Sequence, residues 1–334
     1  MAEINIQVPD VFLTRALIDG SVMVEGFPVA FKAAVFDQRS SRRLRGEVEE
    51  EWAGTEQVLT DFLVRLSKGQ EPNLVVLPIF VTWGMNHRIF VMRRGSLPPK
   101  DLAGKKVGMG RVLGATSVFL RGLIADDYGV GRDQVPWVAA EPMTSDGAMG
   151  AEWKYLSQRG GVRPPELISQ LEKGELDAVM YPGGAGGHWF NWAVEGGAGK
   201  SPNPYGDIEQ MVKNSSNLCF PVGEVETQIQ WFKRWEFYPL YHCLAVRREV
   251  AEQNPGLCAA LVNAFNRAAT MGVRYLTPEQ QGLFGREIKL LGVDPNRCGL
   301  TPLNVRSVEK CLDYLEADGV LPRRPTIKEI FPFS

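Results

Sequence analysis

Apolar and polar residues alternate in short blocks along most of the chain, and their spacing changes from block to block. Runs that alternate strictly, or that are apolar throughout, predict strands, whereas apolar residues three and four positions apart predict amphipathic helices. Residues 57–66 show the helical spacing and are followed by Gly69, a common helix end. The first part of the chain thus contains predicted strands at 4–8, 27–35 and 73–80 and predicted helices at 12–18 and 57–66.

A second series of strands and helices begins after a proline-rich crossing at residues 97–104. Strand character then returns at Phe237, and the rest of the chain is mostly helical in its spacing. The predicted strands of this part lie at 106–109, 135–139 and 176–181, and the predicted helices at 115–124, 165–171, 255–275, 280–291 and 305–315.

Strands that alternate with helices predict an α/β fold with a mostly parallel sheet in each of two lobes. The length of 334 residues, 44% of them hydrophobic, also favours two compact units over one. Because strand character returns at Phe237, we expect the chain to leave the first lobe and later to come back and complete it. The expected division is 1–95 and 240–334 for lobe one and 96–239 for lobe two.

The charge balance excludes broad classes of partner. The 37 basic and 39 acidic residues nearly cancel, so no net field attracts nucleic acid or an anionic membrane. No stretch reaches the roughly 18 apolar residues that span a bilayer, and the first residues lack the pattern of a signal peptide. We therefore expect a cytoplasmic protein without nucleic-acid or membrane partners; a homo-oligomer is compatible with the sequence, which leaves the oligomeric state open.

Metal and nucleotide sites are not expected. The five cysteines form no CxxC pair, and the three histidines are dispersed, without ligand spacing. Residues 108–117 are rich in glycine but lack both the complete GxGxxG fingerprint and the P-loop lysine. The sequence therefore predicts a site that works without metal or cofactor.

His87 and His242 are the candidate catalytic residues. Each lies at the end of an apolar run that predicts a strand. Histidine is the side chain whose unperturbed pKa lies closest to neutral, so a pair facing one cleft would suit proton transfer to a substrate. A single histidine near a strand end is more often structural, and this reading stands beside the catalytic one.

Several loops that follow predicted strands carry residues suited to a small aromatic acid. In open α/β lobes, ligands bind outside the carboxyl ends of the strands. The turn at 108–117 offers glycines, an arginine and two hydroxyls before a helix, a combination that holds carboxylates. The loop at 181–190 is glycine-rich with aromatic ends, and it is either a ligand contact or a plain surface loop. The residues that we expect to bind substrate are Trp83, Arg88, Arg111, Thr116, Ser117, Tyr181, His188, Trp189 and Tyr241.

Short motifs in a fixed order along the chain carry a family resemblance. They include TRALIDGSVMVEG at 14–26, DLAGKKVG at 101–108, GELDA at 174–178 and YPLYH at 238–242. In order and spacing they resemble the 4,5-dihydroxyphthalate decarboxylase family. The resemblance implies a two-lobed fold like that of type II periplasmic binding proteins, with the ligand cleft between the lobes.

The resemblance also implies an activity, the cofactor-independent decarboxylation of a hydroxylated aromatic carboxylic acid. His87 or His242 would then protonate the ring carbon, Arg111 with Thr116 and Ser117 would position an anionic group, and Trp83 and Trp189 would shield the ring from water. Trp83 stands where relatives usually have an arginine, so a phthalate, a monoacid or a differently substituted ring all stay open. The alternative function is a solute-binding protein for a small aromatic or other organic acid, without catalysis.

Overall fold

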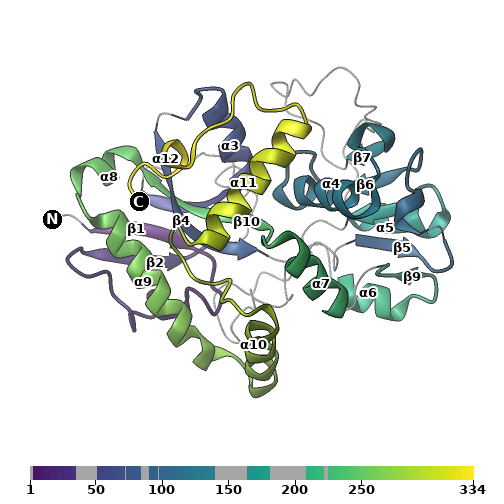
Figure 1. The fold of residues 1–334 in the computed structure, drawn as a ribbon. Helices are drawn as coiled ribbons and strands as arrows, with labels where there is room; N and C mark the ends of the chain where they lie inside the picture. The colour runs from purple at the N-terminus through teal and green to yellow at the C-terminus, as the bar shows by residue number, and fades with distance from the viewer. Residues whose placement is uncertain are drawn as a thin grey trace.

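The computed structural model describes residues 3–34, 51–71, 73–83, 90–96, 98–139, 164–180, 208–221 and 225–334. Within these ranges the strands form two five-stranded sheets. Figure 1 shows the two sheets side by side, each with its own helices, as two lobes. The predicted α/β fold with two lobes is therefore confirmed.

The first sheet has the strand order β2-β1-β3-β10-β4. Strand β1 is parallel to β2 and β3, whereas β10 is antiparallel to both of its neighbours, β3 and β4. Strand β10, which follows Phe237, thus lies in the first sheet between β3 and β4. The strands are β1 (Ile4–Val8), β2 (Val29–Ala33), β3 (Gly54–Val58), β4 (Leu74–Trp83) and β10 (Leu240–Arg247).

Strand β4 shows how this sheet separates two hydrophobic cores. Val75, Leu77 and Ile79 belong to one core with the helix α9 (Leu257–Gly272), whereas Val76 and Phe80 belong to the other. The second core also receives helices α3 (Leu59–Ser67) and α11 (Pro302–Ala317), and it continues into the second lobe. Alternation of apolar side chains along a central strand buries both faces of the sheet.

The second sheet has the order β7-β6-β8-β5-β9. Strand β6 is parallel to β7 and β8, and β5 is antiparallel to β8 and β9. One face shares a core with helix α4 (Ala115–Tyr128), and the other with α5 (Pro164–Lys173) and α6 (Ile208–Asn214). The strands are β5 (Phe90–Arg93), β6 (Val107–Met109), β7 (Trp137–Ala139), β8 (Ala178–Met180) and β9 (Leu218–Cys219).

The remaining helices are short or peripheral. Helix α7 precedes the return to the first sheet, and α10 follows α9 (Figure 1). These helices are α1 (Arg15–Ile18), α7 (Val225–Trp235), α8 (Arg248–Gln253), α10 (Pro278–Leu291) and α12 (Ile327–Ile330).

Three element boundaries differ from the predictions. Gln57 and Val58 end strand β3 instead of beginning a helix, because both pair with β10 in the sheet. Helix α4 continues to Tyr128, where Gly129 ends it in the left-handed conformation at φ 66°. Strand β5 already pairs in the second sheet, so the chain changes sheet before the expected boundary at residue 95. The division into two domains otherwise stays a prediction.

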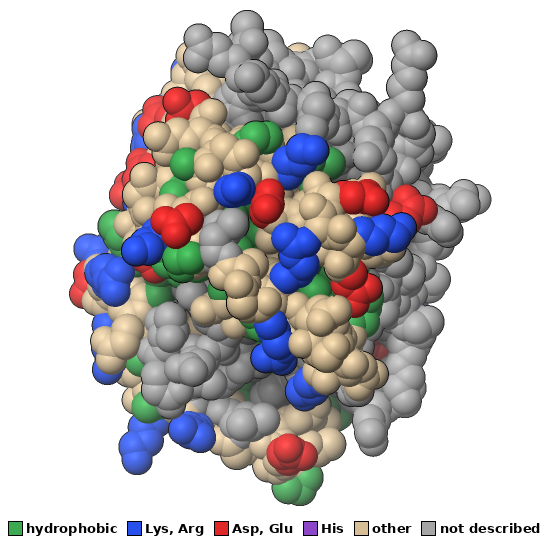
Figure 2. Space-filling model, turned by 90° about the vertical axis from the view of Figure 1, so that its right-hand side faces the viewer, with side chains coloured by type: hydrophobic (Ala, Val, Ile, Leu, Met, Phe, Trp, Pro, Cys, Tyr) green, Lys and Arg blue, Asp and Glu red, His purple; other side chains and the backbone are tan. Residues whose placement is uncertain are grey.

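The surface of the second lobe carries both signs of charge. Figure 2 shows lysine and arginine side chains interspersed with aspartate and glutamate among the described residues of that face. Within the described ranges, no helix is both long and apolar enough to cross a bilayer. The cytoplasmic location stays a prediction.

Candidate active site

His242 is the third residue of strand β10, close to the end at which the chain enters the first sheet. In strand β10 it stands opposite Val58, the last residue of β3, and opposite Thr82 near the end of β4. The pairing with β4 is irregular on both sides of His242, as at a β-bulge, which re-aims side chains. The imidazole side chain is 24% exposed. His242 is therefore at the carboxyl ends of β3 and β4, where α/β folds bind ligands.

Glu56 of strand β3 binds the His242 ring. The distance from Glu56 Oε1 to His242 Nδ1 is 2.6 Å, and the glutamate side chain is 13% exposed. Leu244 stands opposite Glu56 in the register, so Glu56 and His242 are diagonal neighbours across the antiparallel pair. Glu56 was not predicted from the sequence, because it lies 186 positions from His242 and no local pattern indicates that β3 pairs with β10.

Tyr241 and Cys243, which flank His242 in β10, are part of the hydrophobic core. Tyr241 is buried and meets Phe119 of α4 edge to face at 6.4 Å, while Cys243 is fully buried with its thiol toward the carbonyl oxygen of Gln57. Burial raises the pKa of the Tyr241 phenol and of the Cys243 thiol well above their ordinary values. Cys243 is therefore poorly suited to act as a nucleophile. Substrate binding by Tyr241 stays a prediction.

The turn between β6 and α4 reaches across to the first lobe. Arg111 Nη2 lies 2.9 Å from Asp61 Oδ2 of α3, and the Thr60 hydroxyl donates to the carbonyl oxygen of Leu113 at 2.6 Å. The aspartate side chain is only 9% exposed and that of Arg111 29%, so water screens this ion pair incompletely. Arg111 thus faces lobe one, and a protein carboxylate already offsets part of its charge.

Helix α4 begins directly after this turn. Gly114 is its N-cap and supplies no side-chain cap, so the positive end of a 14-residue helix points at the turn. The Ser117 hydroxyl is buried, and none of the described residues hydrogen-bonds it. The backbone N–H groups of the first turn and this hydroxyl can donate to a carboxylate. Anion binding by Arg111, Thr116 and Ser117 stays a prediction that this geometry supports.

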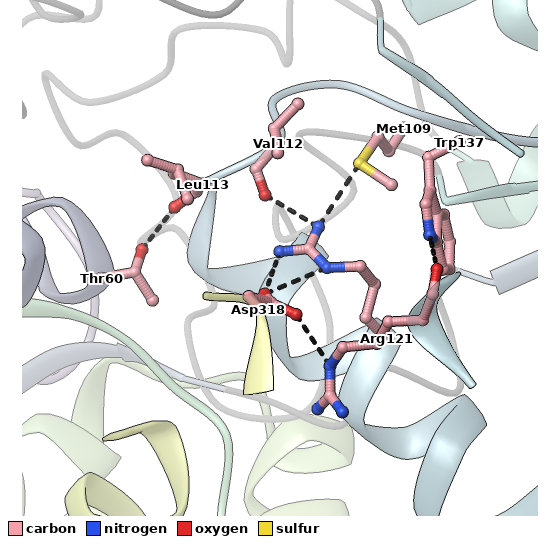
Figure 3. Close-up of polar contacts among 8 residues, drawn as sticks. Thr60, Met109, Val112, Leu113, Arg121, Trp137 and Asp318 are labelled. Carbon is pink, nitrogen blue, oxygen red and sulfur yellow. Dashed lines mark hydrogen bonds and ion pairs between the residues drawn. The ribbon is translucent and has the colours of Figure 1, made fainter. Parts of the chain in front are cut away.

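Arg121 of α4 binds the same turn through the carbonyl oxygen of Val112. Its guanidinium is fully buried, donates to the Val112 carbonyl oxygen at 2.8 Å and pairs with Asp318 at the end of α11 (Figure 3). Asp318 is also paired with Arg132, whose Nε lies 2.8 Å from Asp318 Oδ1. Because α11 packs on the first sheet, this buried network fixes the turn of the second lobe to the first lobe.

The other candidate site residues lie outside the described residues. Trp83 is described only as the last residue of β4, without its side chain. The approach of His87 to His242 is therefore not tested. The remaining candidates in this group are His87, Arg88, Tyr181, His188 and Trp189.

The described residues contain no cluster of three or more histidine, cysteine, aspartate or glutamate side chains that could hold a metal ion. The groups that can do chemistry here are an imidazole bound to a carboxylate, a guanidinium paired across the lobes and the positive end of α4. Together they can exchange a proton and hold an organic anion.

Comparison with curated proteins finds two relatives with one name. The chain is 24% identical over 350 residues to the 4,5-dihydroxyphthalate decarboxylase of Comamonas testosteroni, covering 98% of this chain and 96% of the relative. It is 26% identical over 184 residues to the enzyme of the same name from Pseudomonas putida, covering 54% of this chain and 70% of the relative. No family model matches the chain.

Two of the solved structures with a similar fold are periplasmic sulfonate-binding proteins. The periplasmic sulfonate-binding protein SsuA from Methylobacillus flagellatus superposes with a TM-score of 0.58 at 12% identity, covering 99% of this chain and 91% of that one. SsuA from Escherichia coli gives 0.54 at 11% identity, covering 99% and 97%. At such identities only the fold is shared, and it is the two-lobed fold that the motifs imply. The resemblance of this chain to the 4,5-dihydroxyphthalate decarboxylase family is thus confirmed along nearly its whole length.

Proposed function

We propose that this chain is a cofactor-independent decarboxylase of a hydroxylated aromatic carboxylic acid related to 4,5-dihydroxyphthalate. The observation that carries the proposal is the similarity to a decarboxylase of that name over 98% of the chain. The two relatives with this name support a decarboxylase; the proton donor, the exact acid and the independence from cofactors are our proposal.

The chemistry requires an acid and an anion site, and no redox step. A ring hydroxyl donates electron density to the carbon that bears the carboxylate, and this carbon takes up a proton. The bond to the carboxylate then breaks, its electron pair restores the aromatic ring, and carbon dioxide leaves. One proton is consumed, and a C–H bond replaces the carboxylate. A positioned histidine can supply the proton.

His242 is the donor that the described geometry supports best, with His87 as the other candidate. The imidazole is partly exposed at the carboxyl ends of two strands, so a substrate can reach it. Its Nδ1 is bound to Glu56, so its Nε2 is the ring nitrogen that the substrate would meet.

The turn before α4 would hold the anionic group. Arg111, Thr116 and the buried hydroxyl of Ser117 stand at the positive end of the helix. Donors fixed by the backbone orient a carboxylate at little further entropic cost. Trp83 and Trp189 would then shield the ring, so that the leaving carboxylate is poorly solvated.

A solute-binding function is the second candidate, favoured by the similarity of the fold to SsuA. One assay distinguishes the two functions. It measures the release of carbon dioxide by the purified protein from a panel of hydroxybenzoates and hydroxyphthalates. We expect release without added cofactor, and equal release in the presence of a chelator. Tight binding of an acid from the panel without any release would favour the binding protein.

A further inference from the structure

We propose that Glu56 is a positioning residue that fixes the orientation and the proton arrangement of the His242 ring. The evidence for the contact is geometric and does not depend on the reaction. Its catalytic consequence rests on the proposed function, in which His242 protonates the substrate.

The contact determines which ring nitrogen carries a proton toward β3. A glutamate carboxylate has only acceptor atoms, so at 2.6 Å from Glu56 Oε1 the Nδ1 of His242 must donate. In the neutral ring the hydrogen is then on Nδ1 and Nε2 carries the lone pair. When the ring is protonated, Nε2–H becomes the proton available for transfer. Glu56 thus directs the exchangeable proton away from β3.

The position of Glu56 is suited to hold the ring still. Strands β3 and β10 are neighbours inside the five-stranded sheet, and their pairing extends over the whole of β3, from Gly54 to Val58. Backbone held in a continuous hydrogen-bonded ladder moves little, so a side-chain contact between the two strands has a well-defined geometry. The pairing of β10 with β4 is irregular at His242, and Glu56 supplies a fixed contact on the opposite, regular side.

If Glu56 had a purely structural role, its replacement would mainly change the stability of the fold. Ion pairs that are partly exposed add little to stability, so replacing Glu56 should cost little folding free energy. The same replacement should release the ring, because the acceptor for Nδ1–H is lost. Measuring both the free energy of unfolding and the tautomer of His242 therefore distinguishes a positioning role of Glu56 from a purely structural one.

The test measures, in the full chain, which ring nitrogen of His242 carries the hydrogen. With only three histidines in the sequence, ¹⁵N-labelled imidazoles can be assigned by the single variants His87→Asn, His188→Asn and His242→Asn. At a pH where the rings are neutral, we expect wild-type His242 to carry its hydrogen on Nδ1. In Glu56→Val the Nε2–H form should gain population, while kcat falls by roughly 10- to 100-fold and KM stays within about threefold.

Thr55→Val is the matched control. Thr55 neighbours Glu56 in β3 but faces the other side of the sheet, and the exchange hardly changes its volume. It should alter neither the tautomer nor kcat. If Glu56→Val folds poorly, Glu56→Thr serves instead.

Each outcome is decisive. A wild-type His242 with its hydrogen on Nε2, or a tautomer that does not respond to Glu56→Val, overturns the positioning role whatever the activity. A shifted tautomer with unchanged kcat overturns its catalytic consequence. A wild-type protein that releases no carbon dioxide refutes the proposed function, and the tautomer still tests the contact.

Discussion

At the scale of single residues, Asp61 is the clearest addition to the predicted site. The sequence indicated Arg111 as a cation for the substrate, yet the structure pairs it with a nearly buried aspartate. Such a pair lowers the positive potential of the turn before α4. We therefore expect the proposed site to favour a substrate with one negative charge over one with two.

Replacing Asp61 by Asn should shift this preference. The variant raises the local charge by one unit, so KM for a hydroxyphthalate dianion should fall by about fivefold relative to KM for a hydroxybenzoate, on the order of 1 kcal/mol. Asp101→Asn, which replaces an exposed aspartate outside α3, is the control. An equal change of KM for both acids would show that Asp61 does not tune the charge preference.

The buried thiols should make the protein less stable at alkaline pH. Burial raises the pKa of Cys258 to about 11 and that of Cys298 to about 12. Both thiols are neutral in the folded chain, whereas in the unfolded chain they ionise near 9. The free energy of unfolding should therefore be constant for these groups below pH 9 and decrease from pH 9 through 12. Urea unfolding at pH 8 and pH 10 measures this, and Cys258→Ala should reduce the difference; an unchanged difference would assign it to other groups.

At the scale of elements, the hydrophobic pattern predicted most strands and helices but not their partners. Helix α9 and the core strand β4 are found near where their apolar spacing indicated. The apolar spacing could not assign residues 57–58, because the end of a strand and the first turn of a helix can bury apolar side chains at the same positions. The contact of Glu56 with His242 depends on pairing between β3 and β10, which local patterns do not encode.

The packing of α4 against α11 depends on one glycine, Gly122. A Cβ atom on Gly122 of α4 would lie 2.2 Å from the Tyr314 ring of α11, and this ring is buried. Gly122→Ala should therefore destabilise the fold by roughly 1–3 kcal/mol. Gly282→Ala in α10, where nothing lies within 4 Å, should stabilise it by about 0.5–1 kcal/mol. Urea unfolding measures both, and similar values for the two variants would contradict this account of α4 packing.

At the scale of the whole molecule, a buried ion pair joins the two lobes. Arg121 and Asp318 are both fully buried, and Arg121 also holds the turn before α4. The lobes were predictable from the strand order, but this junction was not, because a buried arginine in an apolar helix gives no local signal of its partner. The same limit applies to Asp61, which sits in the amphipathic pattern of α3.

Removing one partner of this junction should be costly. Arg121→Met leaves Asp318 with Arg132 but without its second guanidinium, so we expect a loss of about 3–5 kcal/mol. The double variant Arg121→Met with Asp318→Leu should lose less than the sum of the single variants, because the interaction between Arg121 and Asp318 is counted in both single losses but is lost only once. Additive losses would show that the two side chains act independently.

The central claim is that a histidine, His242 or His87, protonates the substrate. The direct measurement is kcat for carbon dioxide release by His242→Asn and His87→Asn, on the acid of the panel with the highest kcat/KM. We predict that kcat falls by about a hundredfold or more for at least one of the two, with His242 as the expected residue. Near-normal kcat in both variants would contradict the claim and leave His188 as the remaining histidine to test.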